Sequence, residues 1–459
     1  MIQTKIKYSL FFSLASCLLI TGCSSVKHTK QDNDRKLKKP VTHRVEVETN
    51  KNKVRYSNLS DVWKLNQSSR LNTTISPNLN SSKNKLNVNK KKRQANMMIA
   101  KRNTSKVVIA QKRIKLNTVL NHLREAVPKK RSAYLTGDYA SNPRVVAFIK
   151  KMTQKHGFDP GYLNYLFSHT KLTPFLARMA YRDAYGQKKK SKRANRGKWN
   201  RYRGNFVTKR TIDKGVQFWK QNRIALRKAE LRYGVPQEYI LGIIGVETRY
   251  GENVGKNKAI EALAAMGFEN PRRGAYFQKE LESYLLMTRK EGIDPLKPPA
   301  SYAGALGLCQ FMPSNIKRYG VDHDGNGHVN LWSARDAIGS VANYFQKHGW
   351  RKGGTVAVPA RYTNSGYKLL RTGFKSSHSL ARLTKTGISA KQLGNITNKA
   401  SLIKLNTYSG DELWLGGPNF YVITRYNHSS HYAMAVHQLA QAIKQRIGGS
   451  MLIRQASLQ

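Results

Sequence analysis

Residues 240–251 read ILGIIGVETRYG, and they place one carboxylate, Glu247, at the end of the most apolar helix-like run of the chain. On a helix, residues three and four positions apart lie one above the other. Three isoleucines therefore precede Glu247 on the same face or close to it: Ile240, Ile243 and Ile244. The run predicts an apolar helix with a carboxyl group one turn beyond its isoleucines.

Two interpretations of Glu247 follow from this helix alone. Gly242 and Gly245 would let another element approach closely, and a carboxyl in an apolar site has a raised pKa because burial disfavours its charged form. Such a glutamate can keep a proton near neutral pH and give it to a leaving group. Alternatively, Glu247 is an exposed helix-end residue that pairs with Arg249 or a neighbouring lysine. The helix by itself leaves both interpretations open.

The charge of the chain indicates its partners more than its fold. Its 459 residues include 82 Lys and Arg against 25 Asp and Glu, a net charge of +57. Such an excess favours nucleic acid, anionic lipid or an anionic polymer as a partner. No nucleic-acid-binding motif accompanies it, so we expect no nucleic acid.

The first residues predict export and a lipid anchor. Residues 1–22 combine a short basic start with an apolar run too short to span a bilayer, which is typical of a signal peptide. Thr21 and Gly22 before Cys23 resemble a bacterial lipobox, which would make Cys23 the lipidated first residue of the mature chain. Ser24 then favours the outer membrane, facing the periplasm. The alternative is a cleaved secretory signal with an accidental cysteine.

The sequence predicts a basic tether followed by an ordered, mainly α (α+β) fold. Residues 23–131 are rich in Lys, Arg, Asn and Ser, which predicts a mostly disordered segment. Either it contacts anionic wall polymer or lipid headgroups, or it is a solvated tail with no specific partner. We expect a helical subdomain over 132–235, a catalytic core over 236–351 and a small β-rich subdomain over 352–414. A strand and a helix over 415–449 complete the core. The β-branched and aromatic stretch FYVITRY (420–426) predicts the strand, and Ser429 or Ser430 and Gly448 are expected to begin and end the last helix.

A glycine-rich stretch, SYAGALGLCQFMPSN (301–315), is the second candidate for chemistry. Its glycines permit tight backbone and a close ligand, and Gln310 could hold a sugar acetamide or the catalytic carboxyl. The alternative is a buried loop that packs Phe311 and Met312. The chain has three cysteines, Cys17, Cys23 and Cys309, so a mature chain with lipidated Cys23 would have no disulfide. No histidine is placed to activate Cys309 as a nucleophile.

The stretch DHDGNGHVNLWSARD (322–336) is the metal candidate. Oxygen ligands at loop positions 1, 3 and 5, with Gly327 at position 6, fit a loop of the EF-hand type that binds Ca²⁺. The ligands would be the side chains of Asp322, Asp324 and Asn326 and the backbone carbonyl of His328. Position 12 is Ser333 in place of the usual glutamate, and a turn without metal is the alternative.

Six motifs in one order closely resemble the membrane-bound lytic murein transglycosylase B family. They are GVETRYG (245–251), PRRGAYF (271–277), SYAGALGLCQFMPSN (301–315), DHDGNGHVNLW (322–332), DAIGSVANYFQKHGW (336–350) and NFYVITRYNHSSHYAMAV (419–436). The resemblance covers about 141–448 and implies a lysozyme-like helical core. It also implies cleavage of the β-1,4 bond between N-acetylmuramic acid and N-acetylglucosamine in peptidoglycan, with a 1,6-anhydromuramyl product.

The resemblance also assigns roles to individual residues. Glu247 matches the catalytic glutamate, which acts first as an acid and then as a base, and no second carboxylate stands out beside it. The late Asp336 matches the residue that closes a lengthened calcium loop. The implied substrate-binding residues are Ser301, Gln310, Tyr344, Tyr426, Asn427, Tyr432 and, on a weaker match, Tyr202. Arg272 and Arg273 could pair with carboxylates of the peptide stem, and a solvated basic pair is the alternative.

Two alternatives remain open at this point. A muramidase of the same fold would hydrolyse the bond and release reducing ends. A lipoprotein that binds peptidoglycan without cleaving it would not need Glu247. We expect a monomer with a stabilising calcium ion and no organic cofactor.

Overall fold

A computed structural model of the chain describes residues 130–186 and 196–456. The predicted signal peptide, the predicted lipidation site Cys23 and nearly all of the basic segment 23–131 lie outside these residues. Within the described part, no helix is both long enough and apolar enough to cross a membrane.

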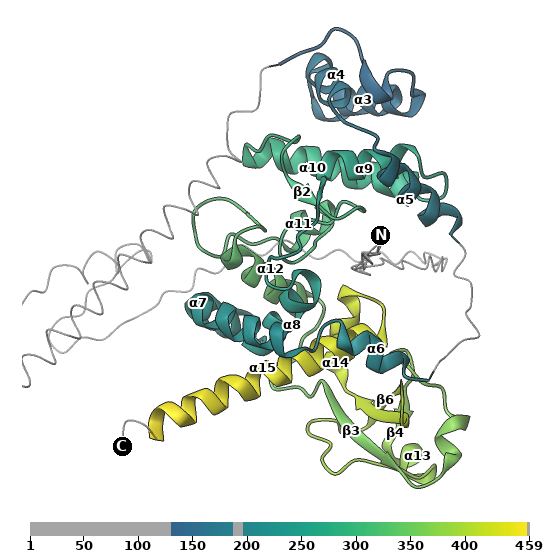
Figure 1. Cartoon of the computed structure of the whole chain (residues 1–459), viewed down its shortest axis with the longest axis vertical. Helices are drawn as coiled ribbons and strands as arrows, with labels where there is room; N and C mark the ends of the chain where they lie inside the picture. Colours follow the sequence, from purple (N-terminus) through teal and green to yellow (C-terminus); the bar gives the residue numbers. More distant parts are fainter. Residues whose placement is uncertain (1–129, 187–195, 457–459) are drawn as a thin grey trace, which may run out of the picture. The chain divides into compact units, whose positions relative to one another are not determined.

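Most of the described chain is helical (Figure 1). The helices are η2 (Gly137–Tyr139), α3 (Pro143–His156), α4 (Pro160–Ser168), α5 (Pro174–Tyr185), α6 (Lys198–Gly204), α7 (Lys209–Tyr233), α8 (Gln237–Thr248), α9 (Ala259–Phe268), α10 (Gly274–Glu291), α11 (Pro313–Tyr319), α12 (Ala334–Lys347), η3 (Ser365–Leu369), α13 (Leu380–Lys385), α14 (Pro418–Tyr426) and α15 (Ser430–Ala456). The strands are β1 (Asn257–Lys258), β2 (Pro299–Ala300), β3 (Ala357–Tyr362), β4 (His378–Ser379), β5 (Ile388–Ser389), β6 (Lys399–Thr407) and β7 (Gly410–Gly416).

Polar caps and prolines start the N-terminal helices where the sequence places them. The side chains of Asn142, Asp159 and Thr173 each accept a hydrogen bond from a backbone N–H of the first turn, and a proline follows each of them. These residues satisfy donors that a helix start leaves unpaired, and proline fits there because it has no N–H to lose. Gly234 ends α7 in the left-handed region at φ 71°, which glycine adopts without steric cost.

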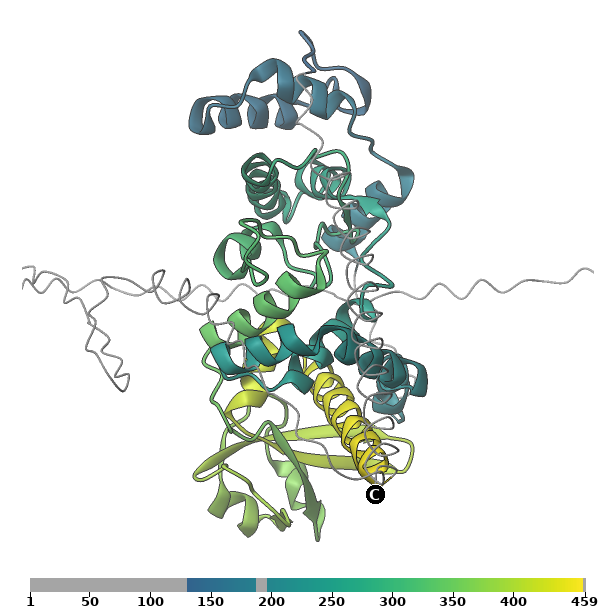
Figure 2. The ribbon, with the colours of Figure 1, turned by 90° about the vertical axis from the view of Figure 1, so that its left-hand side faces the viewer.

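Helix α8 carries Glu247 and lies at the centre of the helical core. Every residue of α8 from Tyr239 to Thr248 is buried, and α8 contacts α7, α12 and α15 (Figures 1 and 2). A Cβ atom at Gly242 would lie 2.8 Å from the carbonyl oxygen of Val436 in α15. The expected close approach at this glycine is thus made by α15.

The small antiparallel sheet has the strand order β4-β6-β7-β3-β5. Alternate residues of a strand point to opposite faces, and β6 uses both of its faces. Ile403 and Leu405 join the main helical core, whereas Leu402 joins a separate small core with Leu413 and Leu415. The predicted mainly α fold with a small β-rich part is confirmed.

Two predicted elements near the end of the chain are wrong. Residues 420–426 form most of helix α14, not a strand, because Pro418 starts a helix whose Phe420, Val422 and Ile423 are buried. Tertiary burial of one helical face outweighs the weak β preference of these residues. The last helix begins at Ser430 as expected, but it continues past Gly448 to Ala456.

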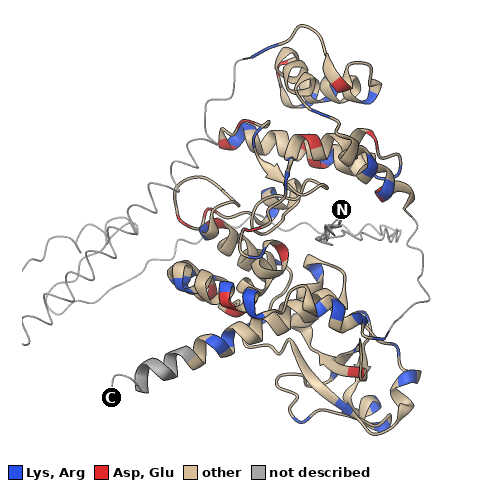
Figure 3. Cartoon of the chain, viewed as in Figure 1, with Lys and Arg blue, Asp and Glu red and all other residues tan. Residues whose placement is uncertain are grey.

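Charge is distributed unevenly along the described chain (Figure 3). Residues 236–351 contain 14 Lys and Arg and 12 Asp and Glu, a net charge of +2. Residues 352–414 contain 10 Lys and Arg but only Asp411 and Glu412 as acids, a net charge of +8. The part of the chain that contains Glu247 is therefore close to neutral, and the basic excess lies in the segments that flank it.

Candidate active site

Glu247 is buried beside one hydroxyl donor. Glu247 is only 8% exposed. The hydroxyl of Tyr432, on α15, donates a hydrogen bond of 2.5 Å to Oε1 of Glu247. Burial raises the pKa of Glu247 to about 7, and the hydrogen bond from Tyr432 opposes that rise. An ion pair with Arg249 would instead hold the pKa low, so the buried-acid interpretation of Glu247 describes this site.

In the part of the chain that the structure describes, the ionisable groups whose pKa values the charge of Glu247 changes are three phenols and a thiol. The charge of Glu247 adds to the rise that burial causes in the pKa values of Tyr202, Tyr426, Tyr432 and Cys309. Neither a second carboxylate nor a cation among the described residues contributes to the pKa of Glu247 itself. The site therefore resembles a single acid in an aromatic enclosure, and it lacks the paired carboxylates of most glycosidases.

Tyr344 and Tyr426 line up with Tyr432, but their hydroxyls bind the backbone. The ring of Tyr426 stacks on that of Tyr432, with centroids 6.5 Å apart, and packs against Tyr344 at 4.8 Å. The hydroxyl of Tyr426 donates to the carbonyl of Cys309 at 2.6 Å, and that of Tyr344 donates to the carbonyl of Arg425 at 2.6 Å. These bonds hold the three rings in place; Tyr344 and Tyr432 are buried, and Tyr426 is half-buried.

Tyr202 approaches the site from α6. Its ring stacks near Trp199 and lies 5.6 Å from the ring of His431. Burial, followed by the charge of Glu247, raises the pKa of the Tyr202 phenol. The structure thus brings Tyr202 close enough to Glu247 to sense its charge.

The glycine-rich loop positions two polar side chains, Gln310 and Ser301, through hydrogen bonds to the backbone. Gln310 has φ 51°, in the left-handed region, and its Nε2 donates to the carbonyls of Val254 and Gly307 at 3.2 and 3.0 Å. The Oγ of Ser301 accepts a bond from the N–H of Ala305 at 3.0 Å. A backbone conformation that is unusual for a non-glycine residue is maintained only where the surroundings impose it. The two hydrogen bonds of Gln310 therefore fix the position of its side chain.

The loop also packs apolar side chains, as the alternative interpretation expected. Phe311, Met312 and Cys309 are all buried, and burial raises the pKa of the Cys309 thiol. A thiol in this environment stays protonated and is a poor nucleophile.

Thr248, which the sequence reasoning missed, ties α8 to this loop. Its Oγ1 donates to the carbonyl of Leu308 at 2.9 Å and accepts from the N–H of Gly251 at 3.2 Å. Thr248 directly follows Glu247, so its bond to Leu308 fixes the end of α8 against the glycine-rich loop. The only signal in the sequence was a hydroxyl residue directly after the candidate acid.

Asn427, Arg272 and Arg273 make their hydrogen bonds and ion pairs with other parts of the fold and not with Glu247. Asn427 ends α14, and its carbonyl accepts from the N–H of Ser429 at 2.7 Å. Arg272 donates to the carbonyl of Ala184 at 2.9 Å, and Arg273 pairs with Asp183 at 2.9 Å. Both arginines thereby hold the end of α5 against the start of α10, and a substrate would have to use their remaining N–H groups.

The predicted calcium loop brings three carboxylates together. Asp322, Asp324 and Asp336 can each point one oxygen into a cluster whose atoms lie within 4.8 Å of one another. Asp336 is fully buried in the first turn of α12, and burial raises its pKa to about 6. The Oδ1 atom of Asp324 is buried without a hydrogen-bond partner among the described residues. Three hard oxygen donors with an unsatisfied buried oxygen suit Ca²⁺.

The other two predicted ligands show different contacts. The Oδ1 of Asn326 accepts from the N–H of His328 at 2.9 Å, and Nδ1 of His328 lies 3.1 Å from a carboxylate oxygen of Glu291 at the end of α10. Gly327 has φ 85°, as the turn requires. Glu291, which the sequence reasoning did not single out, therefore connects α10 to the metal loop.

Comparison with known proteins agrees with this geometry. Residues 140–441 match the family described as transglycosylase SLT domain. The chain is 48% identical to membrane-bound lytic murein transglycosylase B of Escherichia coli (strain K12) over 317 residues, which cover 69% of this chain and 87% of that protein.

Two solved structures of the Escherichia coli lytic transglycosylase Slt35 are also similar. One is a complex with bulgecin A at 47% identity, and the other is a complex with calcium at 46% identity. Each aligns with a TM-score of 0.64 and covers 68% of this chain and 96% of the solved chain. With more than half of its length matched and a relative this similar, the chain belongs to the family of SLT-domain transglycosylases.

Proposed function

We propose that this protein is a peptidoglycan lytic transglycosylase that cleaves the β-1,4 bond between N-acetylmuramic acid and N-acetylglucosamine. The observation that carries the proposal is Glu247, a buried carboxyl with a pKa of about 7 and no second carboxylate among the described residues near it. One group that is half protonated near neutral pH can serve both as the acid and as the base of a reaction.

The two steps use the same carboxyl group in turn, first as the acid and then as the base. Protonated Glu247 gives its proton to the glycosidic oxygen while the bond from that oxygen to C1 of the muramyl sugar breaks. The 6-hydroxyl oxygen of the same sugar then bonds to C1 and its proton passes to the carboxylate of Glu247. The enzyme returns to its starting state, and the muramyl product carries a 1,6-anhydro ring.

The phenol of Tyr432 keeps the carboxyl group of Glu247 in place between these steps. Its hydrogen bond to Oε1 stabilises the carboxylate that the first step creates. The rings of Tyr344, Tyr426 and Tyr202 are proposed to form the surface against which a sugar packs. Ser301, Gln310 and Asn427 supply polar groups for acetamide and hydroxyl oxygens, and Arg272 and Arg273 are the candidates for carboxylates of the peptide stem.

The acidic loop is proposed to hold a stabilising Ca²⁺ ion. Asp322, Asp324 and Asp336 would supply the carboxylate ligands, with Asn326 and the carbonyl of His328 completing the set. The support is the buried, unpartnered oxygen of Asp324 and the calcium complex of Slt35. The ion would supply charge neutralisation and hold the loop between α10 and α12.

We place the protein at the outer membrane, facing the periplasm, as a monomer anchored through lipid on Cys23. The support is the sequence of residues 1–24 and the name of the Escherichia coli relative, which is membrane-bound. The basic segment 23–131 would then let the enzyme reach anionic wall polymer or lipid headgroups by electrostatic attraction.

Mass spectrometry of purified sacculi digested by the protein tests the proposed activity. Anhydromuramyl ends from the wild-type protein, and none from Glu247→Gln, are the expected result. Reducing ends alone would identify a muramidase instead. Lytic activity that survives Glu247→Gln would refute the single-acid mechanism.

A further inference from the structure

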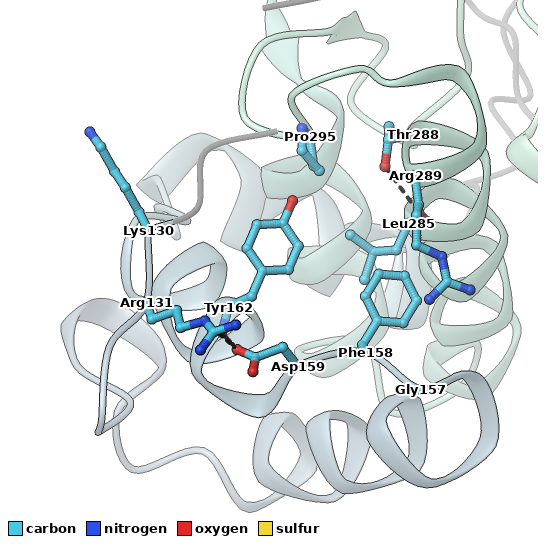
Figure 4. Close-up of a pocket in the computed structure, with 10 residues that line it drawn as sticks. All are labelled: Lys130, Arg131, Gly157, Phe158, Asp159, Tyr162, Leu285, Thr288, Arg289 and Pro295. Atoms are coloured by element: carbon cyan, nitrogen blue, oxygen red, sulfur yellow. Dashed lines mark hydrogen bonds and ion pairs between the residues drawn. The ribbon is translucent and has the colours of Figure 1, made fainter. Parts of the chain in front are cut away.

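A cavity lies among residues that the active site does not use (Figure 4). Its volume is about 630 Å³, within the range of about 300–1,000 Å³ that is typical of ligand sites. The turn between α3 and α4 forms one wall, and the C-terminal half of α10 forms the other. The lining residues are Lys130, Arg131, Gly157, Phe158, Asp159, Tyr162, Leu285, Thr288, Arg289 and Pro295.

One side of this cavity is aromatic and apolar. Figure 4 shows the ring of Tyr162 extending across the cavity, with its hydroxyl directed toward Pro295. This hydroxyl has no hydrogen-bond partner among the described residues, and burial raises the pKa of the phenol to about 12. Tyr162, Phe158, Leu285 and Pro295 therefore form a surface that suits a sugar ring or an aliphatic chain and offers one free hydroxyl.

Three of the lining residues are cations, and one lining acid offsets them only in part. Arg131 pairs with Asp159 at 3.4 Å, but the side chain of Arg131 is 71% exposed, so the pair is weak. Arg289 stacks over the ring of Phe158 at 4.1 Å and donates to the carbonyl of His156 at 2.8 Å. No carboxylate among the described residues forms an ion pair with Arg289 or Lys130. The cavity thus has cationic groups available for an anion.

We propose that this cavity binds a second stretch of peptidoglycan, with a sugar or aliphatic face against Tyr162 and Pro295. Carboxylates of a peptide stem would pair with Arg289, Arg131 and Lys130. This inference rests on the proposed function, because that function presents the enzyme with a polymer that carries both sugar rings and carboxylates. A neutral glycan would use the apolar surface but leave the cations without a partner.

Such a site would raise the efficiency of cleavage on intact wall material. A protein that holds one polymer at two places makes the second contact intramolecular, and the effective concentration of substrate at the catalytic site rises. A short soluble fragment cannot reach both places at once. The cavity should therefore matter for sacculi and not for short fragments.

The binding test uses the full chain with Glu247→Gln in detergent, so that no cleavage occurs. Calorimetric titration with a disaccharide tetrapeptide that has free stem carboxylates should show two sites. Adding Tyr162→Ala or Arg289→Gln should leave one site, and amidating the stem carboxylates should weaken the second site about tenfold, as expected for losing a charge-assisted bond. Matched control changes at exposed residues outside the cavity, Tyr134→Ala and Lys150→Gln, should leave both sites.

A kinetic test uses the chain with intact Glu247. Tyr162→Phe and Arg289→Gln should lower kcat/KM on sacculi severalfold, through KM, and leave turnover of a short soluble strand unchanged. Their thermal midpoints identify any variant that fails to fold, and Tyr162→Phe keeps the ring in place. A single site in the titration, or a second site that Tyr162→Ala and Arg289→Gln leave intact, would overturn the inference. Because the titration requires no cleavage, its failure is distinct from an absence of anhydro products.

Discussion

The hydroxyl of Tyr432 and the carboxyl of Glu247 lie 185 residues apart in the chain and 2.5 Å apart in the fold. The bond joins α15 to α8, two helices that are in close contact at Gly242. The donor opposes the effect of burial on the pKa of Glu247. The position of α15 therefore determines both the orientation of the candidate acid and its proton affinity.

Glu247→Gln should abolish cleavage and stabilise the folded protein at high pH. General acid–base groups contribute about 10²–10⁴-fold to rate, so at least that loss is expected. The pKa of Glu247 is about 7 in the fold against a reference value of 4.5. Its contribution to the free energy of unfolding is therefore complete below pH 4.5. It declines by about 3 kcal/mol as the pH rises through 7. Gln has no proton to lose, so thermal melts at pH 4 and pH 8 should show the advantage of Gln only at pH 8.

Tyr432→Phe should shift the pH dependence of activity upward. The Tyr432 bond lowers the pKa of Glu247, so its removal should raise that pKa and keep the acid protonated to higher pH. The falling limb of kcat/KM, expected near pH 7 for the wild-type protein, should move to higher pH while the maximal rate falls about tenfold through lost orientation. Tyr408→Phe, an exposed tyrosine in the sheet part, is the control. An unchanged limb would show that Tyr432 does not act on Glu247.

Calcium should stabilise the protein through the acidic loop. At a concentration one hundred times the Kd, a bound ion adds about 2.7 kcal/mol to the free energy of unfolding. We expect a chelator to lower the thermal midpoint of the wild-type protein. Asp324→Asn should remove that response and Asp138→Asn, outside the cluster, should preserve it. Identical midpoints with calcium and with chelator would argue against the ion.

Gly242→Ala should loosen the contact between α8 and α15. A Cβ at this position would lie 2.8 Å from the carbonyl of Val436, closer than van der Waals contact allows. Overpacking of this kind costs about 1–3 kcal/mol, so the thermal midpoint should fall. Activity at 25 °C should fall as well, because displacement of α15 carries Tyr432 away from Glu247. Gly204→Ala, which has open space for a Cβ, should change neither.

Local signals mark the bounds of the N-terminal helices, but they indicated the last elements of the fold wrongly. Asn142, Asp159 and Gly234 are caps whose chemistry acts within a few residues, so they could be recognised without the fold. Residues 420–426 have β-branched and aromatic side chains that suit a strand equally well. Their helix depends on burial against distant parts of the chain, which no local pattern records.

The site was predictable to the extent that it resembles a known family. The isoleucines before Glu247 left both a buried and an exposed carboxyl open, and the resemblance favoured the buried one. Its partner lies on α15, which begins 182 residues after α8 ends, a separation that spacing cannot bridge. The spacing of Asp322 and Asp324 indicated the acidic loop, and resemblance added Asp336. Thr248 and Glu291 escaped notice because their partners are a backbone carbonyl and a loop far along the chain.

Cys309 gives the protein an internal reporter of active-site opening. Its thiol is fully buried, its carbonyl accepts the hydroxyl of Tyr426, and it is the only cysteine after residue 23. A thiol reagent can reach it only when the glycine-rich loop separates from the aromatic row. The rate of Cys309 alkylation under native conditions would therefore measure how often this part of the molecule opens, without any added label.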